Sequence, residues 1–266
     1  TVNGHSVNKV IWTKIGASDA WRYEYVYQVP TNETQGLAQI RVAMTDRAEN
    51  IFVHSFNDSL IVDTITPTVA SVEVNPSLAK AGPITISFAV SETLEADPVV
   101  SVNGNSAARI NNEQLIINNN EYQYIYNVSA ADQQGSAVLT ITAADLAGNT
   151  SLFTLAPIST SGPHSSLTID TLPVAISNVD IDVVSNPRGS ASTAYAKLGD
   201  KVKVDFSVSE PLLSGPIVAI GGLLASQESQ TIYDADRIDY SYALTPVPSD
   251  LPDGTTSVSI EVTDLA

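Results

Sequence analysis

The stretch Ala144-Asp145-Leu146-Ala147-Gly148-Asn149 closes a run of alternating apolar residues and predicts the turn of a β-hairpin. Altered copies of it stand at Thr45-Asp46-Arg47-Ala48-Glu49-Asn50 and at Thr263-Asp264-Leu265-Ala266. The aspartates of successive copies are 99 and 119 residues apart, about the length of one small β-domain. We therefore expect a chain of repeated modules. Because Glu49 stands where the middle copy has Gly148, we expect the first turn to differ in geometry.

Three kinds of segment recur around these turns, and all of them alternate with period two. Each copy has a short apolar strand, a tyrosine-rich strand and a strand that leads into the Asp turn. None shows a helical period over three turns, so the pattern predicts an all-β chain. The short strands end at Val2-Asn3-Gly4, Val102-Asn103-Gly104 and Ile220-Gly221-Gly222; the aromatic runs span 21–29, 122–128 and 238–244; the runs before the turns span 37–42, 138–142 and 258–262.

A further pair of matching segments defines the domain boundaries. Residues 79–92 and 196–210 align with one residue of difference in spacing, and nothing comparable precedes Val2. We therefore expect a first domain at 1–66 without its N-terminal strands, a complete domain at 67–172, and a third at 173–266 without its last strand. Such a chain is expected to be a piece of a longer one.

The predicted joins between domains share a sequence. Residues 61–67 and 168–173 each run from a strand into Asp-Thr and then reach proline. Proline fixes its own φ and pushes the preceding residue towards extended geometry, so these connectors are short and stiff. They favour an extended array over modules on a flexible string.

The composition limits the classes of partner. There are 29 Asp and Glu against 12 Lys and Arg, for a net charge of −17, so phosphate backbones and anionic lipids are repelled. This argues against nucleic acid and a membrane surface as partners, and leaves cations as natural partners. The chain has no cysteine, which excludes disulfides and thiolate metal sites. No apolar run approaches the roughly 18 residues needed to span a bilayer.

Strand count and turn spacing together predict a seven-stranded antiparallel sandwich for the middle domain. The runs ending Ser91-Glu92 and Ser209-Glu210, the turn at Asp145 and the joins at Asp63 and Asp170, in which Asp-Thr soon precedes a proline, are similar to those of bacterial Ig-like repeat domains of large surface proteins and adhesins. The resemblance implies tandem Ig-like sandwiches at an extracellular or cell-surface location. Such repeats serve as spacers, as adhesive modules and as appendages of exported enzymes, so the resemblance specifies fold better than function.

Acidic side chains are expected to gather at the joins, because the B–C and F–G loops of an Ig sandwich lie at the end that receives the incoming linker. Hard oxygen ligands from a linker and two loops are what Ca²⁺ requires. The competing explanation is local: Asp and Asn recur in turns because their side chains accept backbone N–H bonds. Candidate ligands at the first join are Asp63, Glu92, Glu95, Asp97, Asp145 and Asn149, and at the second Asp170, Glu210 and Asp264.

The tyrosine-rich runs also allow two interpretations. An exposed aromatic row stacks on sugar rings, but repetition of the row in all three domains favours packing in or beside the core. Catalytic constellations are absent: His5, His54 and His164 fall in different modules or loops and match no zinc or triad spacing. We therefore expect no enzyme.

These observations predict structural spacer repeats of a long bacterial extracellular protein, with neighbouring Ig-like domains of the same chain as partners and Ca²⁺ as a stiffening ion. Two alternatives stay open. One is an adhesive module that binds a glycan or a protein receptor. The other is a subunit of a filament or surface layer, in which unpaired sheet edges are completed by another copy.

Overall fold

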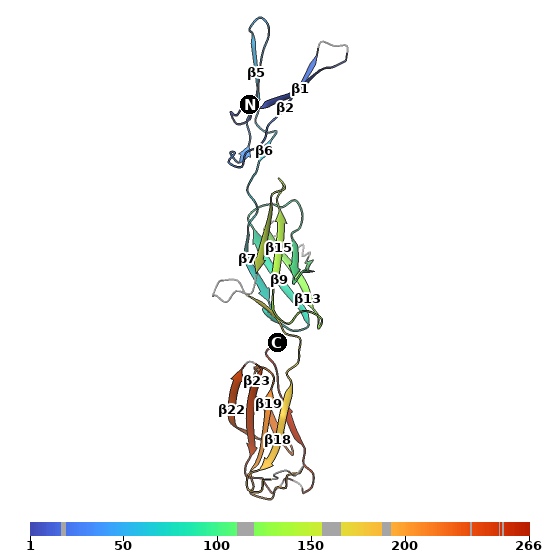
Figure 1. The fold of residues 1–266 in the computed structure, drawn as a ribbon, viewed down its shortest axis with the longest axis vertical. Coiled ribbons are helices and arrows are strands. Elements are labelled where there is room, and N and C mark those ends of the chain that lie inside the picture. Colours follow the sequence, from blue (N-terminus) through green and yellow to red (C-terminus); the bar gives the residue numbers. More distant parts are fainter. Residues whose placement is uncertain are drawn as a thin grey trace. The chain divides into compact units, whose positions relative to one another are not determined.

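The computed structural model describes residues 1–16, 20–110, 120–155, 166–187, 193–234, 236–249, 251 and 253–266 (Figure 1). The chain divides into two compact units, one of residues 1–75, 83–127 and 136–167, the other of residues 76–82, 128–135 and 168–266. We refer to residues 1–66, 67–172 and 173–266 as the first, middle and third repeats; these boundaries stay a prediction. Across the described ranges, no helix is long and apolar enough to cross a membrane.

The middle repeat contains two four-stranded sheets (Figure 1). Their strand orders place the two ends of the repeat's sequence in different sheets, as in Ig domains, which confirms the predicted all-β, Ig-like sandwich. One sheet has the order β12(Ala108–Arg109)-β13(Glu121–Val128)-β9(Gly82–Val90)-β7(Val69–Asn75), and the other β11(Asn105–Ser106)-β10(Val99–Val102)-β15(Leu139–Ala144)-β16(Thr150–Leu155).

One pairing departs from the expected antiparallel pattern. A small sheet has the order β14(Gly135–Ala137)-β17(Leu167–Ile169)-β8(Leu78–Ala79), and within it β17 runs parallel to β8. Thr168 donates its N–H to the carbonyl of Ser77 at 2.8 Å, and Asp170 donates to Ala79 at 2.9 Å. The last strand of the repeat is thereby bonded to a strand near its beginning.

The core of the middle repeat follows the period-two pattern of its sequence. In β9 and β13 alternate residues are buried, because successive side chains of a strand point to opposite faces. Ile84, Ile86, Leu139 and Ile141 are at most 1% exposed. Burial of such side chains, each worth about 1.5–3 kcal/mol, is the main source of stability in a chain without disulfides.

The third repeat has the same strand order over most of its length, and its main sheet is gold to dark red in Figure 1. A cluster that includes Val204, Phe206, Ile220 and Tyr242 forms its core. Among the described residues, no strand corresponds to β16 or β17. The sheets are β18(Ile176–Val183)-β19(Val202–Val208)-β23(Arg237–Leu244)-β22(Ser226–Asp234) and β21(Leu223–Leu224)-β20(Ile217–Ile220)-β24(Val258–Glu261).

In its described residues the first repeat contains two-stranded sheets. They are β1(Asn8–Lys14) with β2(Trp21–Val26), β4(Ile40–Thr45) with β5(Ile51–Phe56), and β3(Gly36–Leu37) with β6(Ile61–Val62). Within the described part of this repeat no strand corresponds to β7 or β9. Its buried apolar cluster is accordingly small, with Val2, Ala38 and Val62 at its centre.

Equivalent turns show that the repeats are related in detail. Asn3 and Asn103 both have φ of 48°, and each is followed by a glycine with φ above 80°. Asn3 exchanges two hydrogen bonds of 2.8 Å with the backbone of Gln39, and Asn103 does the same with Val138. The predicted correspondence of Val2-Asn3-Gly4 with Val102-Asn103-Gly104 is therefore confirmed.

Candidate functional site at the two joins

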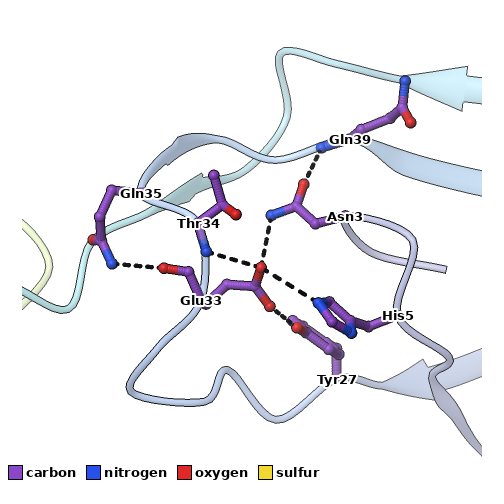
Figure 2. Close-up of polar contacts among 7 residues, drawn as sticks. All are labelled: Asn3, His5, Tyr27, Glu33, Thr34, Gln35 and Gln39. Atoms are coloured by element: carbon purple, nitrogen blue, oxygen red, sulfur yellow. Dashed lines mark hydrogen bonds and ion pairs between the residues drawn. The ribbon is translucent and has the colours of Figure 1, made fainter.

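At the first join, the linker is held by a glutamine from the first repeat. The Thr64 N–H donates to Gln35 Oε1 at 2.8 Å, and Gln35 Nε2 donates to Thr64 Oγ1 at 2.8 Å. The same Nε2 donates to the carbonyl of Glu33 at 2.9 Å (Figure 2). Asp63 Oδ1 accepts the N–H of Ile65 at 3.0 Å, which bends the linker locally. The backbone of the linker is therefore hydrogen-bonded at Thr64 and again at Ile65.

The second join repeats this arrangement bond for bond. Gln134 exchanges two 2.8 Å hydrogen bonds with Thr171, and its Nε2 also donates to the carbonyl of Asp132 at 3.0 Å. Asp170 Oδ1 accepts the N–H of Leu172 at 3.3 Å. We call Gln35 with Thr64, and Gln134 with Thr171, the glutamine latches.

A serine binds the backbone shortly after each linker. Ser91 Oγ accepts the N–H of Thr68 at 2.9 Å, and the Ser91 N–H donates to the Thr68 carbonyl at 3.0 Å. Ser209 makes the same two bonds with Ala175, at the same distances. Glutamine thus bonds each linker to the repeat that precedes it, and serine bonds residues that follow the linker within the next repeat.

The Asp145 turn adds a side-chain contact at the first join. Asp145 is 1% exposed; its Oδ1 accepts the N–H groups of Ala147 and Asn149 at 2.8 and 2.9 Å, and its Oδ2 accepts Asn149 Nδ2 at 2.8 Å. Burial raises the pKa of Asp145, but these hydrogen bonds outweigh it and leave the pKa below its usual value. Asn149 Nδ2 also donates to the linker carbonyls of Asp63 and Ile65, at 3.2 and 3.4 Å.

Three carboxylates meet beside this turn. Asp63, Glu92 and Asp145 each place one oxygen within 4.8 Å of the others. Burial first, and then the charges of Asp63 and Asp145, raise the pKa of Glu92. The three carboxylates therefore repel one another, and a cation bound among them would offset this repulsion.

The second join brings together the corresponding acids. Burial, followed by the neighbouring Asp170 and Asp264 carboxylates, raises the pKa of Glu210. Asp264 begins a turn of the same kind, since its Oδ1 accepts the N–H of Ala266 at 2.9 Å. The equivalent bridges Leu94 with Asp145 and Leu212 with Asp264 place the two turns alike.

Not every candidate ligand joins these groups. Glu95 is exposed and contributes its backbone N–H to the Ala144 carbonyl at 3.0 Å, while Asp97 forms an ion pair with Arg109. Asn149 directs its amide nitrogen, a donor, towards Asp145 and the linker. Neither Glu95 nor Asp97 belongs to the close group of three carboxylates, so the structure brings together a smaller set of acids than the sequence suggested.

The donor set is of the type that Ca²⁺ accepts, since all its side-chain atoms are carboxylate oxygens. Asp63, Glu92 and Asp145 would hold the ion at the first join. Asp145 already accepts three N–H bonds within its own turn, so the local explanation accounts for its conformation as well. Both explanations of these acids stay open, and ion binding remains a prediction.

Glu33, one of the few buried charged residues, lies at the centre of a network next to the first latch (Figure 2). Its carboxylate accepts hydrogen bonds from Asn3 Nδ2 at 3.1 Å, from the Thr34 N–H at 3.0 Å and from the Tyr27 hydroxyl. His5 Nε2 lies 3.9 Å from Oε1. The Asn3 bond is the largest of the effects that together hold the pKa of Glu33 below its usual value.

The tyrosine rows divide by repeat. Tyr122, Tyr124 and Tyr126 are buried, as are Tyr240 and Tyr242, which confirms the core interpretation for these two repeats. In the first repeat the row is only partly covered: Trp21, Tyr23 and Tyr25 are each about half exposed, whereas Tyr27 packs against the small buried cluster. The strand that covers the row in the other two repeats has no counterpart among the described residues here.

The histidines show no catalytic arrangement in the part of the chain that the structure describes. His5 faces Glu33, and His54 lies between Phe52 and Phe56 on β5. His164 lies outside the described residues. The sequence alone did not point to the glutamines of the latches. Each of them stands two residues after an acid in aligned segments, Glu33-Thr34-Gln35 and Asp132-Gln133-Gln134.

The comparisons with known proteins found structures that are similar to this chain, but no similar sequence. No family model and no curated protein matches the chain. A crystal structure of the titin domains z1z2 in complex with telethonin is 11% identical, covers 77% of this chain and 98% of its own, and has a TM-score of 0.28. A second tandem of titin Ig domains is 11% identical, covers 74% and 95%, and has a TM-score of 0.25. The Ig-like assignment rests on the strand orders described above.

Proposed function

We propose that this chain is a set of structural spacer repeats of a long bacterial extracellular surface or adhesin-type protein, with no catalytic role. The observation that carries the proposal is the repetition of the join. The same latch, the same serine hydrogen bonds and corresponding acidic residues occur at both joins. A spacer requires linkers of defined local geometry, and these hydrogen bonds support that role.

The bacterial and extracellular context is supported by the sequence resemblance and by the lack of cysteine. Ca²⁺ is the proposed ion of the joins, supported by the raised pKa of Glu92 and Glu210 beside further carboxylates. Extracellular Ca²⁺ sites have Kd values of about 10⁻⁴ to 10⁻³ M, so a tenfold excess of ion would add about 1.4 kcal/mol. That amount suits the stiffening of a joint.

Small-angle X-ray scattering of the whole chain tests both parts of the proposal. We expect a rod with a maximum dimension of about 100 Å or more, since ten residues of strand cover about 33 Å. Addition of millimolar CaCl₂ should narrow the distribution of dimensions, and the double variant Asp63→Ala, Asp170→Ala should remove this response. A particle folded back on itself would contradict the spacer role, whereas a rod indifferent to CaCl₂ and EDTA would remove only the ion.

A further inference from the structure

The β1–β2 hairpin of the first repeat has an unpaired edge where the other repeats have a strand. In the middle repeat β13 lies between β12 and β9, and in the third repeat β23 lies between β22 and β19. Among the described strands, their counterpart β2 pairs with β1 and with no other. Backbone N–H and C=O groups at the outer edge of β2 therefore face no described strand. The equivalent groups of β13 and β23 are hydrogen-bonded to β9 and β19.

The aromatic row on this hairpin lacks the same neighbour. In the middle repeat Phe88 of β9 stacks on Tyr122 and Tyr124, with ring centroids 5.6 and 5.8 Å apart. In the third repeat Phe206 of β19 stacks in the same way on Tyr240 and Tyr242, at 5.7 and 6.0 Å. Tyr23 and Tyr25 occupy the equivalent positions of β2, and within the described ranges no phenylalanine stacks on them.

The cation that accompanies the row is already in place. Arg109 of β12 lies over the Tyr122 ring at 5.0 Å, and Lys9 of β1 lies over the Tyr23 ring at 5.2 Å. The hairpin thus reproduces the side of the sheet that β12 and β13 form, including its cation–π contact. Compared with the sheets of the middle and third repeats, the described part of the β1–β2 sheet lacks the strand that carries the phenylalanine.

We propose that the outer edge of β2 is an acceptor site for one antiparallel β-strand with alternating apolar residues and a central phenylalanine, of the same class as β9 and β19. The strand would be supplied by polypeptide other than residues 1–266, because β9 already lies between β13 and β7, and β19 between β23 and β18. Main-chain hydrogen bonds would give affinity, and the phenylalanine between Tyr23 and Tyr25 would give register.

A peptide with the sequence of residues 82–92 tests this on the whole chain. The two tryptophans of the protein, Trp12 and Trp21, both lie on this hairpin and are 55% and 44% exposed, so their emission reports what covers it. We expect a saturable blue shift on titration, together with slowed hydrogen exchange of the amides of β2. The Phe88→Ser peptide should bind at least about tenfold more weakly. A peptide N-methylated at alternate residues along the pairing edge should not bind.

Four results would overturn the proposal. The first is no change in emission or exchange at millimolar peptide, and the second is equal binding of the Phe88→Ser peptide. The third is retention of the chain on a glycan array that Tyr25→Ala abolishes, which would assign the row to sugar stacking. The fourth is concentration-dependent dimerisation in sedimentation that the peptide does not reverse, which would make a second copy the occupant.

Discussion

Glu49 has φ of 67°, in the left-handed region that glycine tolerates best, and Gly148 has φ of 85° at the same place of the middle repeat. The different geometry expected for the first turn was wrong. Asp46 accepts the N–H groups of Ala48 and Asn50 at 2.8 and 2.9 Å, as Asp145 does in its own turn. The aspartate imposes the turn, and the glutamate adopts the strained φ that the turn requires.

Replacing Glu49 by glycine should therefore stabilise the first repeat by about 0.5–1 kcal/mol, because a left-handed non-glycine residue costs about 1–2 kcal/mol and glycine loses some of that gain in backbone entropy. Urea unfolding followed by the emission of Trp12 and Trp21 measures the effect. The matched variant Gly148→Ala should destabilise the middle repeat, although no atom lies within 4 Å of the added Cβ. A lower urea midpoint for Glu49→Gly would contradict the prediction.

Glu33 makes the first repeat sensitive to acid. Because its folded pKa lies below the ordinary value of 4.5, its contribution to stability is complete above that pH and is lost as the pH falls through the folded pKa. Thermal unfolding monitored by tryptophan emission should accordingly show a steep loss of stability below about pH 4.5. Glu33→Gln should lower the stability at pH 7 and flatten this dependence. An unchanged slope would show that other carboxylates dominate.

At the scale of the element, the glutamine of each latch holds its linker through two hydrogen bonds to a threonine. Gln134→Ala removes both bonds to Thr171 and leaves the Thr171 N–H without its acceptor. A net loss of about 1–2 kcal/mol in local stability is expected. Hydrogen exchange of the Thr171 amide, followed by NMR, should then accelerate by about tenfold, because 1.4 kcal/mol corresponds to a factor of ten.

The neighbouring Gln133 supplies a matched control, since it is exposed and precedes the latch by one residue. Gln133→Ala should leave the exchange of Thr171 unchanged. If both variants accelerate exchange equally, the effect comes from the loop and the latch does not hold the linker. The same pair of measurements applies to Gln35→Ala and the Thr64 amide at the first join.

The elements were largely predictable from the sequence, whereas the contacts between them were not. Period-two alternation and the repeated Asp turn predicted the strands, and matched segments such as 79–92 and 196–210 predicted which strands are equivalent. The two latches join residues 29 and 37 positions apart, and no local pattern reports such a distance. The pairing of Asp97 with Arg109 likewise depends on how loop and strand meet.

At the scale of the whole molecule, the repeats differ in the size of their buried apolar clusters. The buried cluster of the first repeat centres on three residues, whereas that of the third includes large side chains such as Phe206 and Tyr242. Because apolar burial stabilises by about 25 cal/mol per Å², the first repeat should unfold at lower urea than the others. Tryptophan emission, which reports the first repeat alone, should therefore change before far-UV circular dichroism. Coincident transitions would mean that the chain unfolds as one unit.

The parallel pairing of β17 with β8 has a consequence when the chain is pulled by its two ends. Tension draws β8 and β17 in opposite directions along their common axis, so the bonds from Thr168 to Ser77 and from Asp170 to Ala79 are loaded together in shear. A hairpin such as β4–β5, pulled from its open end, would instead lose its bonds one after another. The β8–β17 pairing should therefore make the middle repeat resist unfolding by tension applied to its two ends.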